Sequence, residues 1–186
     1  MAGIFGCLSC PAGVTMQLAV LAALLMIRAA AGSKTQVISY YLQQEFGTNE
    51  LQMTAAARPA LEGTLSGFGQ SVVYEFVMTE TADPASAVMG YVRGTAVAVN
   101  NTAAATVFMV NNVVHYDYKG VQGTLSQQGE AVFTSPWEFV VFGGTGAFRH
   151  AHGYNLGSPV SISRTPSNLT HIVTHYDAHI RLGKSF

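Results

Sequence analysis

The chain has little of what several protein classes require. Its 186 residues include 9 basic and 10 acidic side chains, for a formal net charge of −1. Recognition of nucleic-acid phosphates needs a surplus of Lys and Arg, so this balance excludes a strongly basic nucleic-acid binder. An apolar content of 49% excludes a disordered chain. The length suits one domain, because domains commonly have about 100–200 residues.

The N-terminal segment is rich in apolar residues but lacks a run long enough to cross a bilayer. The uninterrupted apolar run Leu18–Ile27 has ten residues, whereas a membrane span needs about 20. Ala29, Ala30 and Ala31 follow, and signal peptidase accepts such small residues. We therefore predict a secretory signal peptide at residues 1–31 and a mature, extracellular domain at residues 32–186. A chloroplast transit peptide is the alternative, but such peptides are richer in Arg and Ser.

Cysteine is almost absent. The chain has two, Cys7 and Cys10, and both lie in the predicted leader. Their C-x-x-C spacing could indicate a redox or zinc pair, but such sites need a folded scaffold around them. We predict a mature domain with no disulfide, no metal and no cofactor. Asn100 and Asn168 open N-x-Thr sequons and are predicted glycosylation sites of a secreted protein.

The mature part contains 18 Val and 15 Thr but only 8 Leu, 7 Glu and 3 Lys. This ratio favours strands, because β-branched side chains fit a pleated surface. Period-two alternation supports this. Val72, Tyr74, Phe76 and Met78 share one face of residues 71–79. In residues 171–182, one predicted face carries Ile172, Thr174, Tyr176, Ala178, Ile180 and Leu182; the other carries His171, His175, Asp177, His179 and Arg181.

Eight strands are predicted, separated by turns rich in Gly, Pro, Asn and Asp. They are residues 37–42, 71–79, 88–99, 106–119, 123–128, 137–142, 147–156 and 171–182. We predict an all-β fold, an eight-stranded antiparallel closed β-barrel, because closure removes exposed sheet edges in a protein with few charges to guard them. Residues 47–69 are expected to form a long loop over one barrel end.

One stretch of the chain carries a recognisable motif. It runs Gly143-Gly144-Thr145-Gly146-Ala147-Phe148-Arg149 and continues with Ala151, Gly153 and Tyr154. In this motif the chain resembles the plant dirigent family. Three further stretches agree in order and spacing: Asp83-Pro84 through Gly94, Thr124-Leu125-Ser126 with Gly129, and Tyr40-Tyr41-Leu42.

The resemblance implies a barrel of the allene-oxide-cyclase type, secretion to the plant apoplast and cell wall, and a homo-oligomer, dimer or trimer. It also implies a function, which is to hold phenoxy radicals or related phenylpropanoid intermediates so that coupling gives one stereoisomer. Family members do not oxidise the phenol; a laccase or peroxidase partner generates the radical. A small phenolic ligand is the expected occupant, and neither nucleic acid nor membrane is an expected partner.

The sequence departs from the family at several polar positions. Gln43 and Gln44 replace a His-Asp pair, Ala131 stands at a family acid, and Trp137 replaces an Arg. The joint loss of the acid and the Arg avoids an unpaired buried charge, because either one alone in an apolar cavity would cost roughly 3–5 kcal/mol. We therefore expect a flatter, more aromatic cavity. The candidate cavity residues are Tyr41, Gln44, Glu75, Trp137, Phe139 and Arg149, while the catalytic residues are left unassigned.

Two alternatives to stereoselective guidance remain open. One is a non-catalytic cell-wall binding or scaffold barrel that lost its cavity acids, and the other is a plastid allene oxide cyclase. A metal site at His175, Asp177 and His179 is not expected. Strand residues two apart are about 6.6 Å apart and those four apart about 13 Å, too far for both histidines to reach one ion.

Overall fold

The computed structural model describes residues 35–62, 64, 66–99, 105–132 and 134–183. The predicted leader, the Cys7–Cys10 pair and the Asn100 sequon lie outside them. The described residues form nine strands: β1 (Gln36–Glu45), β2 (Glu50–Thr54), β3 (Ser71–Thr79), β4 (Val88–Ala98), β5 (Val107–Tyr118), β6 (Val121–Val132), β7 (Trp137–Gly146), β8 (Ala151–Arg164) and β9 (Thr170–Leu182). Among the described residues, no helix is long and apolar enough to cross a membrane.

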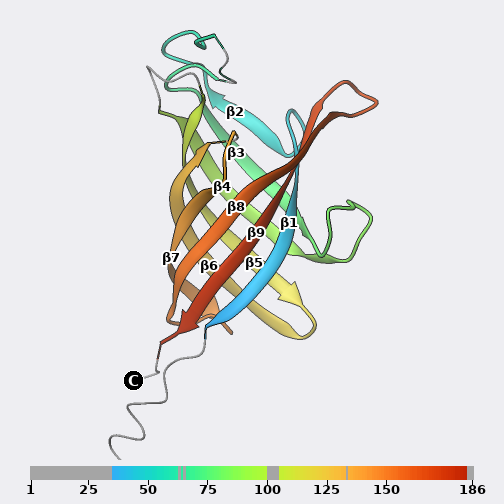
Figure 1. The fold of residues 1–186 in the computed structure, drawn as a ribbon, viewed down its shortest axis with the longest axis vertical. Helices are drawn as coiled ribbons and strands as arrows, with labels where there is room; N and C mark the ends of the chain where they lie inside the picture. Colours follow the sequence, from blue (N-terminus) through green and yellow to red (C-terminus); the bar gives the residue numbers. More distant parts are fainter. Residues whose placement is uncertain (1–34, 63, 65, 100–104, 133, 184–186) are drawn as a thin grey trace, which may run out of the picture. The chain divides into compact units, whose positions relative to one another are not determined.

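Eight of these strands close into a barrel. The sheet runs in the order β1-β9-β8-β7-β6-β5-β4-β3-β2, and β1 also pairs with β3. That additional antiparallel pairing, with Leu42 opposite Met78, joins the two sides of the ring. Figure 1 shows β1, in blue, lying alongside β9, in red. The predicted eight-stranded antiparallel closed barrel is confirmed.

The ninth strand corrects the expectation of a loop at residues 47–69. β2 lies in that stretch and pairs with the first half of β3, while β1 pairs with the second half. The chain therefore breaks between two strands that share one edge of β3. The Asn49 side chain stabilises this connection through two hydrogen bonds to the end of β1. Its oxygen accepts from Glu45 N at 2.8 Å, and its Nδ2 donates to the Gln43 carbonyl at 3.1 Å.

Alternation along each strand decides which side chains enter the barrel. The predicted faces of β3 and β9 are confirmed, since Val72, Tyr74, Phe76 and Met78 are buried, as are Ile172, Thr174, Tyr176, Ala178 and Ile180. On the opposite face of β9, His171, His175, Asp177 and His179 are half-buried and Arg181 is exposed, while Val173 is buried. Some strand ends differ from prediction: β6 is longer at both ends, β7 continues through Gly146, and β8 begins at Ala151. Asn168 is exposed in the β8–β9 turn, and its glycosylation stays a prediction.

Candidate functional site

A cavity lies among the inward-facing side chains of eight strands, β1 to β7 and β9. Its lining includes six aromatic rings, from Tyr74, Phe76, Phe108, Trp137, Phe139 and Tyr176. Three polar side chains, Gln44, Glu50 and Asn112, share the lining with the small apolar residues Leu42, Ala96, Val110 and Ala131. The centre of a water molecule can occupy about 40 Å³, whereas one water needs about 10–15 Å³. The cavity therefore has room for more than one water molecule.

One wall of the cavity is aromatic. The Trp137 and Tyr176 ring centroids are 6.0 Å apart at 69°, and Phe139 lies 6.1 Å from Tyr176. Gly157 pairs with Trp137 in the β7–β8 ladder. A Cβ at Gly157 would lie 2.2 Å from Trp137 Nε1 and 2.7 Å from Tyr176 Cε1. The absence of a side chain at Gly157 therefore makes room for this wall.

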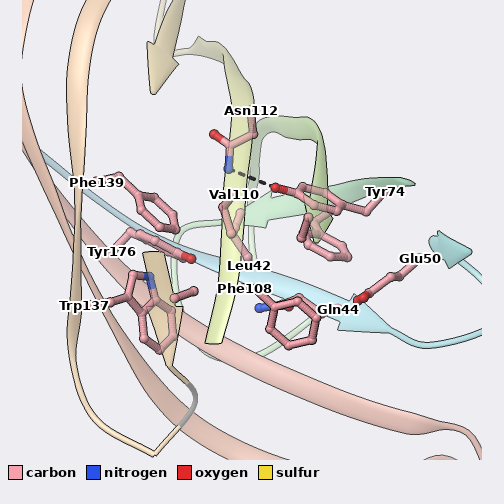
Figure 2. Close-up of a pocket in the computed structure, with 13 residues that line it drawn as sticks. Leu42, Gln44, Glu50, Tyr74, Phe108, Val110, Asn112, Trp137, Phe139 and Tyr176 are labelled. Atoms are coloured by element: carbon pink, nitrogen blue, oxygen red, sulfur yellow. Dashed lines mark hydrogen bonds between the residues drawn. The ribbon is translucent and has the colours of Figure 1, made fainter. Parts of the chain in front are cut away.

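A second wall is organised by a polar contact. Tyr74 stacks on Phe76 with centroids 4.3 Å apart, and Asn112 Nδ2 donates a hydrogen bond to the Tyr74 hydroxyl at 3.1 Å (Figure 2). Gly94 makes the approach possible, since a Cβ there would lie 2.4 Å from Asn112 Cβ and 2.7 Å from the Tyr74 hydroxyl. Burial raises the pKa of Tyr74 above its usual value. The tyrosine is therefore neutral at physiological pH.

Replacing Asn112 with alanine is expected to lower the free energy of unfolding by about 1–2 kcal/mol, because the buried Tyr74 hydroxyl loses its donor. Urea unfolding monitored by circular dichroism measures this. Asn111→Ala is the matched control, since Asn111 is exposed on the same strand, and it should change the free energy by less than about 0.5 kcal/mol. Equal effects of the two substitutions would contradict the role given to the hydrogen bond.

Gln44 and Glu50 bring polar groups to the cavity from either side of the β1–β2 break. Gln44 Nε2 donates to Thr174 Oγ1 at 2.8 Å, which holds the amide against β9. Glu50 pairs with Tyr74 in the β2–β3 ladder and is 8% exposed. Figure 2 shows its carboxyl group turned from β2 toward the other lining side chains.

Glu50 is an ionisable group in an apolar setting. Within the described part of the chain, no cation pairs with its carboxyl group and no donor binds it. Desolvation disfavours the charged form, and burial raises the pKa of Glu50 to about 7. The cavity thus contains a carboxylic acid that exchanges its proton near neutral pH, at a position that was not among the expected cavity residues.

Of the candidate cavity residues, Gln44, Trp137 and Phe139 line the cavity. The structure places the other three outside it. Tyr41 faces outward between Tyr40 and Leu42, and its ring lies 4.7 Å from that of His175.

Glu75 and Arg149 are the other two candidates outside the cavity. Glu75 alternates with the inward Tyr74 and Phe76, is exposed, and pairs with Arg93 on the outer face. Arg149 is exposed in the turn between β7 and β8. Tyr41 and Glu75 face outward because successive side chains of a strand point to opposite faces, and each is the immediate neighbour of a residue that points inward.

Glu50 itself was missed from the sequence because the pattern around it is inverted. Leu51 and Met53 are more than half exposed, while Glu50 is buried. Period-two reading of this stretch would turn the two apolar residues inward. Only the pairing of β2 with β3 puts the acid on the inner face.

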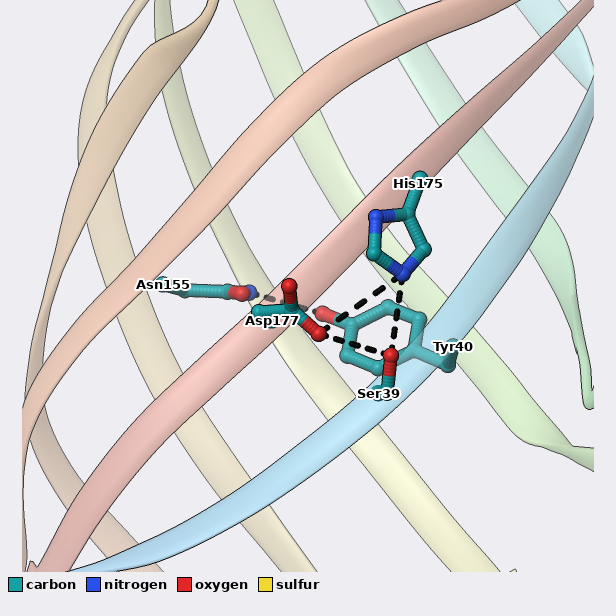
Figure 3. A network of polar contacts seen from close by, with 5 residues as sticks. All are labelled: Ser39, Tyr40, Asn155, His175 and Asp177. Carbon is teal, nitrogen blue, oxygen red and sulfur yellow. Dashed lines mark hydrogen bonds and ion pairs between the residues drawn. The ribbon is translucent and has the colours of Figure 1, made fainter.

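A polar cluster on the outer face joins β1 to β9 (Figure 3). Ser39 Oγ donates to Asp177 Oδ1 at 2.6 Å and lies 2.9 Å from His175 Nε2. In a catalytic triad, the acid binds the ring nitrogen opposite the one facing the serine. Here Asp177 lies 3.6 Å from the same Nε2, so the arrangement lacks the relay that activates a serine.

Inside the barrel, a separate polar network joins Tyr40 on β1, Gln127 on β6 and Asn155 on β8. Asn155 Nδ2 donates to the Tyr40 hydroxyl and to Gln127 Oε1, each at 2.8 Å. All three side chains are at most 1% exposed. Across the described ranges, no group of three His, Cys, Asp or Glu residues has the arrangement of a metal site. Ser39, Asp177 and the Asn155 network therefore tie strands together.

Comparison with known protein families identifies the family of this barrel. A family model described as dirigent-like protein matches residues 35–181. The chain belongs to the dirigent family. A search of curated proteins found no match.

Solved structures with the same fold include two dirigent proteins. The pterocarpan synthase dirigent protein PsPTS1 has a TM-score of 0.69 and 20% identity, over 82% of this chain and 97% of that chain. The pterocarpan synthase dirigent protein GePTS1 has a TM-score of 0.67 and 19% identity, over 82% and 87%. A pyocyanin demethylase has a TM-score of 0.54 and 15% identity, over 78% and 99%. At these identities the likeness concerns the fold.

Proposed function

We propose that this dirigent protein binds phenoxy radicals or related phenylpropanoid intermediates in its barrel cavity and imposes stereoselectivity on their coupling. The observation that carries the proposal is a cavity inside a dirigent barrel, lined by six aromatic rings and a few oriented polar groups. Flat rings stack on aromatic walls, and polar groups at defined places select one orientation. Holding one face of a reactive carbon toward its partner is sufficient to select a stereoisomer.

The oxidation belongs to a separate protein in this scheme. A laccase or peroxidase removes one electron and one proton from each phenol, and two radicals join when their unpaired electrons form a new bond. The barrel supplies orientation and exclusion of water, and its own residues undergo no redox change. Consistent with such a partner, we propose secretion to the plant cell wall and assembly as a homo-oligomer. The leader-like run at Leu18–Ile27 supports secretion.

Cyclisation of a quinone methide is the second candidate reaction. It is favoured by one observation, the buried Glu50 carboxyl group in the cavity, since an acid can exchange a proton with a ligand oxygen there. The two similar structures above are described as pterocarpan synthases. A non-catalytic scaffold would have no need of a buried acid that the apolar surroundings destabilise.

The test is product stereochemistry. Protein purified from plant cells expressing the full chain is incubated with coniferyl alcohol and a laccase, and the coupled products are separated by chiral chromatography. We expect an enantiomeric excess that is absent with laccase alone and is lost in Trp137→Ala but kept in Phe142→Ala, an exposed aromatic of the same strand. Racemic products across several phenolics, with binding retained, would instead indicate a binding or scaffold barrel.

A further inference from the structure

The cavity has an unusual charge balance. Among the residues that the structure describes, its lining includes one acidic side chain, Glu50, and no Lys, Arg or His. An ionised carboxylate in such a place has no cation beside it and is only slightly exposed to solvent, which disfavours the charged form. A protonated carboxyl group, in contrast, can donate one hydrogen bond to an oxygen of a bound molecule.

No other described residue of the lining titrates near neutral pH. The titratable lining groups are Tyr74 on β3 and Tyr176 on β9, and burial raises the pKa of both above the usual value for tyrosine. Charged side chains on the neighbouring elements lie half-buried or exposed outside the cavity lining: Glu45 on β1, Arg58 and Glu62 in the β2–β3 connection, Glu75 on β3 and Arg93 on β4. Glu50 is therefore the group that changes the charge of the cavity between pH 5.5 and 8.5.

Phenols and their oxidised forms differ in the hydrogen bonds that they can form with a carboxyl group. A phenol or alcohol hydroxyl both donates and accepts, so it can bind a carboxylic acid or a carboxylate. A phenoxyl oxygen or a quinone-methide carbonyl carries no proton and only accepts. It gains a hydrogen bond from protonated Glu50 and faces an acceptor, with electrostatic repulsion, when Glu50 is ionised.

We propose that protonated Glu50 is the hydrogen-bond donor for an oxygen that only accepts, so the cavity selects the oxidised, quinone-like or carbonyl form of a phenylpropanoid. The aromatic class of this ligand rests on the proposed function. Selection depends on Glu50 and on its position at the β1–β2 break, which places a carboxyl group opposite Tyr74 in the inner layer. Burial holds the pKa of this group at about 7, so the donor is present below neutral pH and is lost above it.

The test uses two stable probes. 3,4-Dimethoxycinnamaldehyde has only acceptor oxygens, whereas coniferyl alcohol has hydroxyl groups. Binding to the purified full chain is followed by quenching of Trp137, the single Trp of the sequence and part of the cavity wall, and is checked by titration calorimetry. From pH 5.5 to pH 8.5 the protonated fraction of a group with a pKa of about 7 falls about thirtyfold. We expect the aldehyde to bind about thirtyfold more weakly at the higher pH, and the alcohol to change much less.

Two variants separate Glu50 from other titrating groups. Glu50→Gln keeps a donor and removes the titration, so the aldehyde should bind equally at both pH values. Glu138→Gln changes an exposed acid beside Trp137 and should behave as the unaltered protein. A cooperative thermal unfolding transition shows that each variant is folded. If a variant does not fold, the pH series on the unaltered protein still tests the proposal.

Each other outcome has a definite meaning. Equal aldehyde binding at both pH values, or a fall that persists in Glu50→Gln, overturns the assignment of Glu50. If enantiomeric excess is found in the coupling assay at the same time, the proposed function stands without it. Racemic coupling together with pH-dependent aldehyde binding supports Glu50 and overturns the guiding function. No binding of either probe at pH 5.5 overturns both.

Discussion

Replacing Trp137 with alanine is expected to lower the free energy of unfolding by about 3–5 kcal/mol, which is typical for truncation of a large buried aromatic. Trp137 is 6% exposed and packs edge-on to Tyr176 over the space left by Gly157. Its removal deletes contacts on both sides and leaves a void where the two strands of the ladder meet. Urea unfolding followed by circular dichroism measures the loss.

Phe142→Ala is the control for this substitution. Phe142 is on the same strand but is 56% exposed, so its truncation should cost less than about 1 kcal/mol. Trp137→Phe should lie between the two, since it keeps a ring against Tyr176. A cost below about 1 kcal/mol for Trp137→Ala would show that the indole does not support the cavity wall.

Glu50→Gln is expected to stabilise the protein increasingly as pH rises, by about 3 kcal/mol more at pH 8.5 than at pH 4. Burial raises the pKa of Glu50 from 4.5 to about 7. The folded state therefore holds this proton more tightly than the unfolded state. Below pH 4.5 both states are protonated and Glu50 contributes no pH dependence. Between pH 4.5 and 7 the unfolded state ionises first, so stability falls, and above pH 7 the full cost is present.

Chemical unfolding at a series of pH values measures this difference directly. The expected size follows from the rise of the Glu50 pKa from 4.5 to about 7, because a tenfold change in a proton-binding constant corresponds to about 1.4 kcal/mol. Glu138→Gln, which alters an exposed acid, should give a difference that does not vary with pH. A parallel pH profile for the protein and for Glu50→Gln would mean that the carboxyl group is ionised in the folded state at little cost.

Much of the barrel could be predicted because alternation is a local signal. Tyr74 and Tyr176 occupy the faces that period-two reading of their strands assigns. Of the site, Gln44, Trp137 and Phe139 were identified through the resemblance to the dirigent family, and the structure brings them to one cavity. Tyr41 and Glu75 were expected in the cavity, but each lies one residue away from a side chain that points inward. Such a shift reverses the face of every side chain, and motif matching alone does not specify it.

Glu50 lay beyond sequence reasoning for a different reason. Its neighbours Leu51 and Met53 are apolar but exposed, so local hydrophobicity favours the wrong face. Its inward position results from a long-range choice: β1 stops at Glu45, Asn49 ties the break, and β2 takes the remaining edge of β3. Pairing with β2 gives the first half of β3 its hydrogen-bond partners on that edge, and the same register turns Glu50 inward.

By itself, then, the sequence determined the all-β class, the inner faces of β3 and β9, and the dirigent resemblance, because each depends on residues close together along the chain. Tertiary structure decided which polar groups meet in the cavity. Pairing between β2 and β3 brings Glu50 to Tyr74, and pairing between β7 and β8 brings Gly157 under Trp137. Each contact joins residues at least twenty positions apart in the sequence, and its register depends on how the two strands pair rather than on local alternation.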